Sequence, residues 1–303
     1  MADWGIVAAR FLQFGPALIL FGMPSFFLYG VAPERPRSKR GLKYVVAATG
    51  ILSFAGAVWW VLAETAMIFS DPGQFTPDAV WTVLTGTGFG RAAFLRIILI
   101  AVAIVVPFVA RSSRRVWVVQ SLIGATIVAS FAWTGHGVKD EGVAGFVHLV
   151  GDIVHLLAAA IWMGALLALA ALLLTSIRER TGAREVLRGL EAFSSIGVAV
   201  VALLLLSGVI NSWFLVGPSH IGQLLTSPYG LLLDAKLALF AGMLALAAAN
   251  RYRFTPQLSA ALPGAGSQEI SLSVLRRSIV WETALALLVL AIVSLMGTLE
   301  PPA

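Results

Sequence analysis

The chain has 303 residues, of which 59% are hydrophobic and 12% are charged, a balance that excludes a water-soluble domain because this much apolar surface could not be hidden from water. No cysteine is present, which excludes disulfides and thiolate metal sites. The net charge of +6 does not indicate a nucleic-acid partner, because the basic residues lie in short loops between apolar segments.

Eight apolar segments, each long enough to cross a bilayer as a helix, follow one another along the chain. A membrane-spanning helix needs about 20 consecutive apolar residues. We therefore predict an all-α transmembrane bundle of eight helices, which forms a single integral membrane domain over residues 1–303. The predicted helices are Ile6–Val31, Tyr44–Phe69, Gly90–Ala110, Val116–Trp133, Phe146–Thr175, Ala192–Val216, Gly230–Ala249 and Ile279–Thr298.

The lysines and arginines predict how the bundle is oriented. They are concentrated in alternate loops, around Arg35–Lys43, Arg111–Arg115, Arg178–Arg188 and residues 251–277, whereas the other loops hold only Lys139. Because basic loops stay on the cytoplasmic side, both termini are predicted to lie on the non-cytoplasmic side.

The segment Arg178–Glu191 has an amphipathic pattern between the fifth and sixth predicted helices. We expect it to lie along the cytoplasmic interface of the membrane, with Leu187 and Leu190 toward lipid.

All four histidines are predicted to lie in the non-cytoplasmic half. His136 follows the fourth helix, His148 starts the fifth, His155 lies about 10 Å deeper at 1.5 Å per residue, and His220 follows the sixth helix. A histidine near a membrane interface is commonly hydrogen-bonded and holds no ligand. Three histidines close together at two adjoining helix ends favour a metal site instead.

One face of the fifth helix combines imidazoles with a carboxylate. Seven residues make almost two helical turns, so His148, Asp152 and His155 share this face, and Trp162 continues it inward. We predict His136, His148, His155 and Asp152 as metal-site residues. Asp152 acts either as a ligand or as the hydrogen-bond acceptor that orients an imidazole.

Charged side chains on other helices are predicted at the same depth. Arg10, Glu64, Arg96 and Lys236 each cost about 2.5 to 3.5 kcal/mol in hydrocarbon if they are unpaired, so they should face inward. They either form interhelical ion pairs or extend the metal site. The additional site candidates are His220, Glu64, Met67, Trp162, Arg96 and Lys236.

Imidazole binds copper, zinc and haem iron. With no cysteine available, the predicted site suits Cu(II), or Cu(I) with help from methionine or histidine. Haem b is the alternative cofactor, although His148 and His155 lie on one helix, so a haem held by two histidines would need His136 or His220 opposite.

Several short motifs occur in an order that is typical of one family. They are "TGH" at Thr134–His136, the histidine pair with "HLLAAAIWMG" at His155–Gly164, "SGVINSW" at Ser207–Trp213, "SPYGLLLDAKLALF" at Ser227–Phe240, "AAANRYRFTP" at Ala247–Pro256 and "LRRSIVWE" at Leu275–Glu282. In these motifs the chain resembles the bacterial copper resistance D family of CopD- and PcoD-type membrane proteins, most closely over residues 133–298.

The resemblance implies a multi-pass protein of the bacterial inner membrane that serves copper homeostasis. It also implies a periplasmic copper-binding partner of the CopC type, and a transporter rather than an enzyme. By its motifs, the resemblance implies that the functional residues include His136, His148, His155, Trp162, Lys236, Asn250, Arg251 and Glu282. The last three lie toward the cytoplasmic side, where they would gate an exit or stabilise the helix ends.

Copper uptake is therefore the function that we predict from the sequence. Two other functions fit the residues as well: a haem-b-binding membrane oxidoreductase, and a membrane partner that docks a periplasmic copper protein without passing metal. The oxidation state of the copper, the driving force and the oligomeric state stay open.

Overall fold

A computed structural model describes residues 4–30, 36–69, 71–109, 113–134, 142–176, 182–262 and 265–302. Within these residues the structure has no strand, and eight helices are long and apolar enough to cross a membrane. The main helices are α1 Trp4–Tyr29, α2 Pro36–Ile68, α4 Gly88–Val109, α5 Arg114–Ala129, α6 Gly142–Ser176, α7 Gly182–Leu215, α8 Pro228–Ala249 and α10 Ala265–Met296. The predicted all-α bundle is confirmed.

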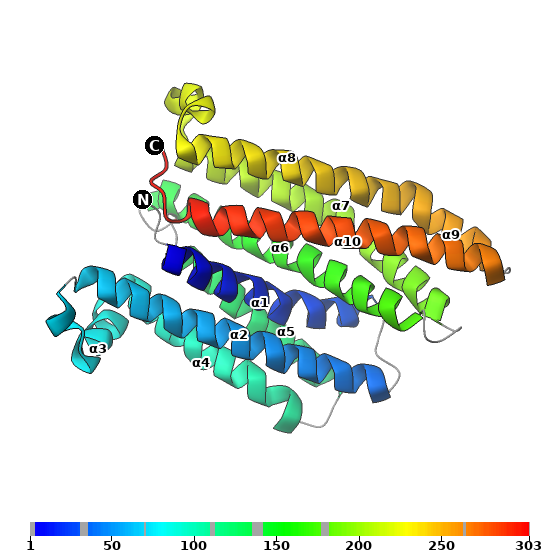
Figure 1. Ribbon diagram of the computed structural model, residues 1–303, viewed down its shortest axis with the longest axis horizontal. Coiled ribbons are helices and arrows are strands. Elements are labelled where there is room, and N and C mark those ends of the chain that lie inside the picture. The colour runs from blue at the N-terminus through cyan, green and yellow to red at the C-terminus, as the bar shows by residue number, and fades with distance from the viewer. Residues whose placement is uncertain are drawn as a thin grey trace.

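Short helices extend or connect these spans. They are η1 Pro72–Gln74, α3 Pro77–Gly86, η2 Ser130–Thr134, η4 Pro218–Leu225, the π-helical turn η5 Asn250–Phe254, and α9 Thr255–Ala261. Among the described residues, α1 begins and α10 ends at the same end of the bundle, which we call the terminal end (Figure 1).

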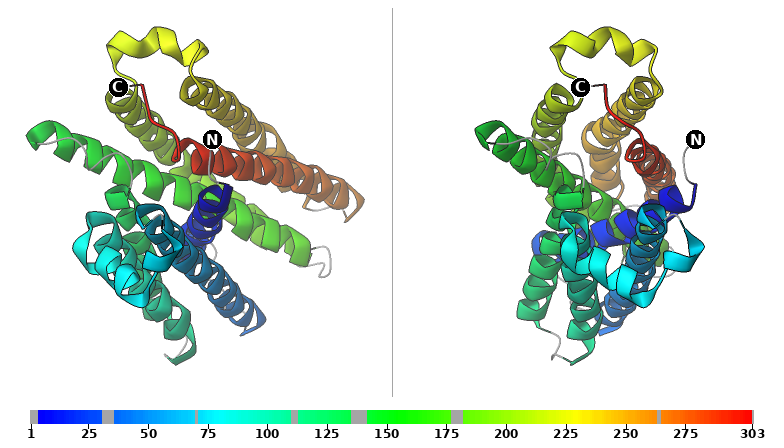
Figure 2. Two further views of the ribbon diagram at one scale, coloured as in Figure 1. Left: turned by 60° about the vertical axis from the view of Figure 1, so that its left-hand side comes forward. Right: turned by 90° about the vertical axis from the view of Figure 1, so that its left-hand side faces the viewer.

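Helix α1 lies between two groups of helices and joins them. It packs against α2 and α5 on one side, and against α6 and α10 on the other. Figure 2 shows α2, α4 and α5 on one side of α1, and α7, α8 and α10 on the other side. The core of buried apolar side chains runs through both groups.

The contact between α1 and α6 depends on two glycines. A Cβ atom on Gly22 would lie 1.8 Å from the carbonyl oxygen of Ala160, and one on Gly164 would lie 2.0 Å from the carbonyl carbon of Gly22. Small residues allow helix backbones to approach closely, as is common in membrane bundles. This crossing determines which face of α6 is turned toward α1 and which toward α7 and α8.

The prediction that the segment Arg178–Glu191 turns Leu187 and Leu190 toward lipid is wrong. Residues 178–181 lie outside the described residues, and α7 runs from Gly182 to Leu215. Leu187 and Leu190 are buried in protein and do not face lipid. The reason is the close approach at Gly189, where a Cβ atom would lie within 3.4 Å of side chains from α6 and α1.

Helix α8 starts earlier and its span continues further than predicted. Ser227 caps it by accepting a hydrogen bond from the Gly230 amide, and Pro228 occupies the first turn, where its missing N–H costs nothing. At the other end the span continues through the π-helical turn and α9 to Ala261. The amide of Thr255 bonds to the carbonyl of Asn250 in this turn, five residues earlier, directly before Pro256.

Candidate functional site

The first half of α6 holds the predicted imidazole and carboxylate face. His148 is buried, with 2% of its surface exposed, and its ring stacks on Phe214 of α7 with centroids 4.7 Å apart and planes 6° apart. Asp152 and His155 are half-buried on the same helix. We call six residues the histidine layer. They are His148, Asp152 and His155 on α6, Ser207 and Asn211 on α7, and Lys236 on α8.

Asp152 lies among groups of opposite charge and hydrogen-bond donors. Its Oδ1 accepts a hydrogen bond from the Nδ2 of Asn211 at 3.3 Å. It also interacts electrostatically with His148 on its own helix and with Lys236 on α8. The opposite charges of Asp152 and Lys236 partly compensate each other, so the layer can hold both inside the bundle.

The hydrogen bonds of Ser207 determine the tautomer of His155. The Ser207 hydroxyl has one proton, and it donates this proton to the carbonyl of Leu203 one turn earlier. Its oxygen therefore accepts a hydrogen bond from the Nδ1–H of His155, 3.0 Å away. In this tautomer the proton lies on Nδ1 and the lone pair on Nε2, and His155 also forms a hydrogen bond with the backbone of Leu204.

The described residues hold no preassembled cluster of three histidine or carboxylate ligands. His136, the fourth predicted ligand, lies outside the described residues. The described part of the site therefore offers imidazoles on one helix face, whereas a metal ion would draw any third ligand from elsewhere or from water.

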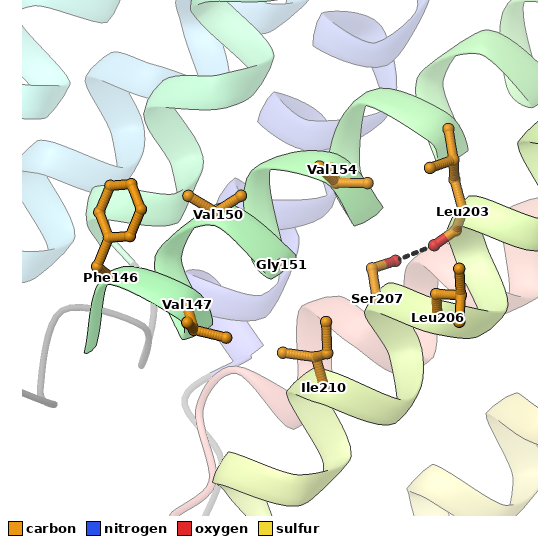
Figure 3. Close-up of a pocket in the computed structure, with 9 residues that line it drawn as sticks. All are labelled: Phe146, Val147, Val150, Gly151, Val154, Leu203, Leu206, Ser207 and Ile210. Atoms are coloured by element: carbon orange, nitrogen blue, oxygen red, sulfur yellow. Dashed lines mark hydrogen bonds between the residues drawn. The ribbon is translucent and has the colours of Figure 1, made fainter. Parts of the chain in front are cut away.

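An apolar groove lies beside the histidine layer, between α6 and α7. Its nine lining residues are Phe146, Val147, Val150, Gly151, Val154, Leu203, Leu206, Ser207 and Ile210. Figure 3 shows these side chains and the Ser207–Leu203 hydrogen bond on the floor of the groove. None of the nine residues carries a charge or an imidazole, so the groove offers no metal ligand of its own.

A second group of buried polar residues includes Trp162, which lies further along α6. We call it the Glu282 layer, and it consists of Trp162 on α6, Asn250 on η5 and Glu282 on α10. The carboxylate of Glu282 on α10 is 1% exposed. One oxygen accepts a hydrogen bond from Nε1 of Trp162 at 2.7 Å, and the other accepts one from Nδ2 of Asn250 at 2.9 Å. An indole N–H only donates, so Trp162 is a partner of Glu282 here and offers no metal ligand.

The predicted charges on α1, α2 and α4 come together in a separate place, the arginine cluster. Arg96 is fully buried, with its guanidinium 4.0 Å from the ring centroid of Phe131. It donates hydrogen bonds to the side chain and carbonyl of Ser130, at 2.8 and 2.9 Å, and to Thr134 at 3.2 Å. These contacts hold η2, where the "TGH" motif begins.

Arg10 completes the arginine cluster from α1. Its guanidinium lies 4.9 Å from the ring centroid of Trp60, whose indole donates to Glu64 at 3.0 Å. Glu64 in turn interacts electrostatically with Arg10. A Cβ atom on Gly297 would overlap this guanidinium, so the end of α10 packs directly over Arg10. Glu64 and Arg96 thus have partners in this cluster and not in the histidine layer.

The other candidates lie apart from the histidine layer. Met67 is 58% exposed on α2, and His220 bonds to Ser219 in η4. Arg251 donates to the carbonyl of Ser194 on α7. Sequence analysis missed Ser207 and Asn211, although two polar residues four apart at the end of a long apolar stretch of a helix indicate a shared polar face.

Comparisons with known proteins give one consistent result. The model of the family "Copper resistance protein D-like, N-terminal domain" matches residues 1–146, and that of "Copper resistance protein D" matches residues 187–296. No solved structure matches the chain.

Two relatives cover almost the whole length of the chain, and a third covers most of it. Copper resistance protein D of Pseudomonas syringae pv. tomato is 34% identical over 99% of the chain and 98% of the relative. Inner membrane protein YebZ of Escherichia coli (strain K12) is 30% identical over 97% and 98%. Copper transport protein CutJ of Bacillus subtilis (strain 168) is 31% identical over 80% of the chain and 46% of the relative.

Proposed function

Because the chain belongs to the copper resistance protein D family, we propose that it carries copper inward across the bacterial inner membrane, with the histidine layer as the entry site. The relatives are named for copper resistance and copper transport, so copper homeostasis is the general function. One relative is named as an inner membrane protein, which agrees with the eight spans.

The observation that carries this proposal is the hydrogen bond between Nδ1 of His155 and the hydroxyl of Ser207, which favours one tautomer of the ring. Its Nδ1–H is engaged by Ser207, so Nε2 is prepared to bind a metal without first losing a proton. Metal binding to imidazole requires the neutral form. Copper accepts imidazole nitrogen in both of its common oxidation states.

His148, His136 and Asp152 have different roles in this proposal. His148 is the second imidazole of the described site, two helical turns before His155. His136 follows η2, which Arg96 holds in place, and would supply a third nitrogen. Asp152 accepts a hydrogen bond from Asn211 and interacts electrostatically with Lys236, so it adjusts the charge of the layer.

The proposed direction of transport is based on the predicted orientation of the bundle. The terminal end is predicted to be periplasmic, because the basic clusters lie at the opposite ends of the helices. The histidine layer then faces the periplasm, and a periplasmic copper-binding protein of the CopC type would deliver the ion there. We treat the chain as one membrane domain, since α1 packs against helices of both groups.

Metal analysis of the detergent-purified protein tests the site. We expect about one copper per chain, which is lost when His148 and His155 are both changed to alanine. His220→Ala is the matched control, because this histidine lies in η4 and should leave the stoichiometry unchanged. Unchanged copper in the double variant would remove the site. A haem absorption spectrum in place of copper would favour an oxidoreductase.

Transport requires its own test. Liposomes that contain the protein and a copper-sensitive dye inside should report uptake, and the double variant should not. Copper binding without uptake would instead support a membrane partner that docks a copper protein.

A further inference from the structure

The carboxylate of Glu282 is buried near the middle of α10, and among the described residues no charged side chain forms a hydrogen bond with it. Its two recorded hydrogen bonds come from the neutral groups of Trp162 and Asn250. Ionisable residues inside a membrane are costly, and they commonly mark ion pathways or proton relays. The role of this carboxylate therefore needs an explanation beyond packing.

Several elements that pack against α10 carry charged or titratable groups, and no interaction with Glu282 is seen for them within the described residues. Within the described residues, burial and the bonds from Trp162 and Asn250 are the interactions that the structure gives Glu282. The charged or titratable groups on the elements that pack against α10 are Arg10 on α1, His148, Asp152 and His155 on α6, Asp234 and Lys236 on α8, and Arg251 and Arg253 on η5. Arg10 contacts Trp60, Lys236 interacts with Asp152, and Arg251 donates to Ser194.

Two polar atoms beside Glu282 are buried without a hydrogen bond. They are Oδ1 of Asn250 and Oγ of Ser278, and both residues are 6% exposed. Ser278 lies one turn before Glu282 on α10, so the two side chains share a face. The Oδ1 of Asn250 is thus an acceptor within reach of the Glu282 carboxyl group that a carboxylic O–H could use.

The backbone at Asn250 supports the same interpretation. Asn250 starts the π-helical turn of η5, and such turns are frequent at functional sites. The amide of Asn250 has one free acceptor and one donor that is already used. It can therefore serve the carboxyl group of Glu282 in either protonation state.

We propose that Glu282 reversibly binds a proton and that this proton is exchanged against copper, which deepens the proposed function and depends on it for the copper step. The charged carboxylate accepts bonds from Trp162 and Asn250. When a proton from water binds one oxygen, the amide of Asn250 turns over and Oδ1 accepts the new O–H, while Trp162 still donates to the other oxygen.

Electrostatics couple the two layers. His155 and Trp162 are seven residues apart on one face of α6, which is about 10 Å along the helix. A copper cation in the histidine layer favours the charged form of Glu282, and a proton on Glu282 weakens copper binding by the same factor. Copper arriving from outside thus drives a proton off Glu282.

Infrared difference spectroscopy of copper-free protein tests proton binding by itself. Between alkaline and acid buffer we expect a carboxylic-acid C=O band to appear, to vanish in Glu282→Gln, and to return in the conservative variant Glu282→Asp. Glu269→Gln is the matched control, since Glu269 is exposed on the same helix. A band that persists in Glu282→Gln, or no titrating band in folded wild type, would overturn the proposal.

Copper titration at several pH values tests the coupling. The copper affinity of wild type should rise with pH by about fivefold or more beyond the rise seen in Glu282→Gln. Equal pH dependence in both proteins would overturn the exchange. Because the infrared measurement contains no copper, loss of copper binding would refute the proposed function alone and leave proton binding by Glu282 independently tested.

Discussion

The histidine layer and the arginine cluster both gather charge near the terminal end of the bundle, but they treat that charge in opposite ways. Arg96 donates hydrogen bonds to Ser130 and Thr134 and packs on Phe131, so its guanidinium is fully enclosed by protein. The Nδ1 of His155 is hydrogen-bonded to Ser207. In the proposed site its Nε2 binds the metal. In the proposed account, the charged groups of the arginine cluster stabilise the fold, whereas those of the histidine layer bind a ligand.

The largest difference between the two regions should appear when the partner of His155 is removed. In Ser207→Ala the imidazole loses the acceptor that holds its proton on Nδ1, so copper affinity should fall about 10- to 100-fold. Isothermal titration of the purified protein with copper measures this. Ser195→Ala, on an exposed turn of the same helix, is the control and should bind copper as wild type does. An unchanged affinity in Ser207→Ala would mean that this hydrogen bond does not prepare the site.

The arginine cluster should respond in stability and not in copper binding. Arg96→Lys keeps the buried charge but cannot reproduce three hydrogen bonds from a planar fork, so we expect a loss of about 2 kcal/mol. Arg96→Met removes the charge together with its bonds and should cost less. Denaturation in detergent measures both variants. A clear loss of copper affinity in correctly folded Arg96→Lys would contradict the claim that the arginine cluster serves stability and not copper binding.

A smaller effect is expected at the edge of the arginine cluster. Trp60→Phe removes the indole that donates to Glu64 and leaves a weaker ring beside Arg10, which should cost about 1 kcal/mol. The melting temperature checks this. Trp59→Phe is the neighbouring control, because Trp59 is 43% exposed. Equal losses in both variants would show that the buried contacts of Trp60 contribute nothing specific.

Apolar segment length predicted the membrane spans, and departures occur where local chemistry overrides hydropathy. The capping of Ser227 and Pro228 moves the start of α8, and the π-helical turn carries its span beyond Asn250. The amphipathic pattern around Leu187 and Leu190 predicted an apolar face on this segment, and both leucines are buried. Hydropathy could not show whether that side meets lipid or protein.

Depth along a helix could be predicted from the sequence, but lateral position could not. Glu64 and Arg96 were placed at the depth of the histidines, yet they lie with Trp60 and Phe131 on the other side of α1. Which helices become neighbours depends on close crossings such as Gly22 with Gly164. A single sequence carries little information about such crossings, whereas the shared face of His148, Asp152 and His155 follows from helical periodicity alone.

X-ray absorption spectroscopy of the copper-loaded protein tests the central claim most directly, because it identifies the atoms bound to the metal. The proposed site predicts nitrogen ligands with the outer-shell scattering of imidazole, which weakens in His155→Ala and is unchanged in His220→Ala. A first shell without imidazole, or an identical spectrum after His148 and His155 are both replaced, would contradict copper binding by the histidine layer.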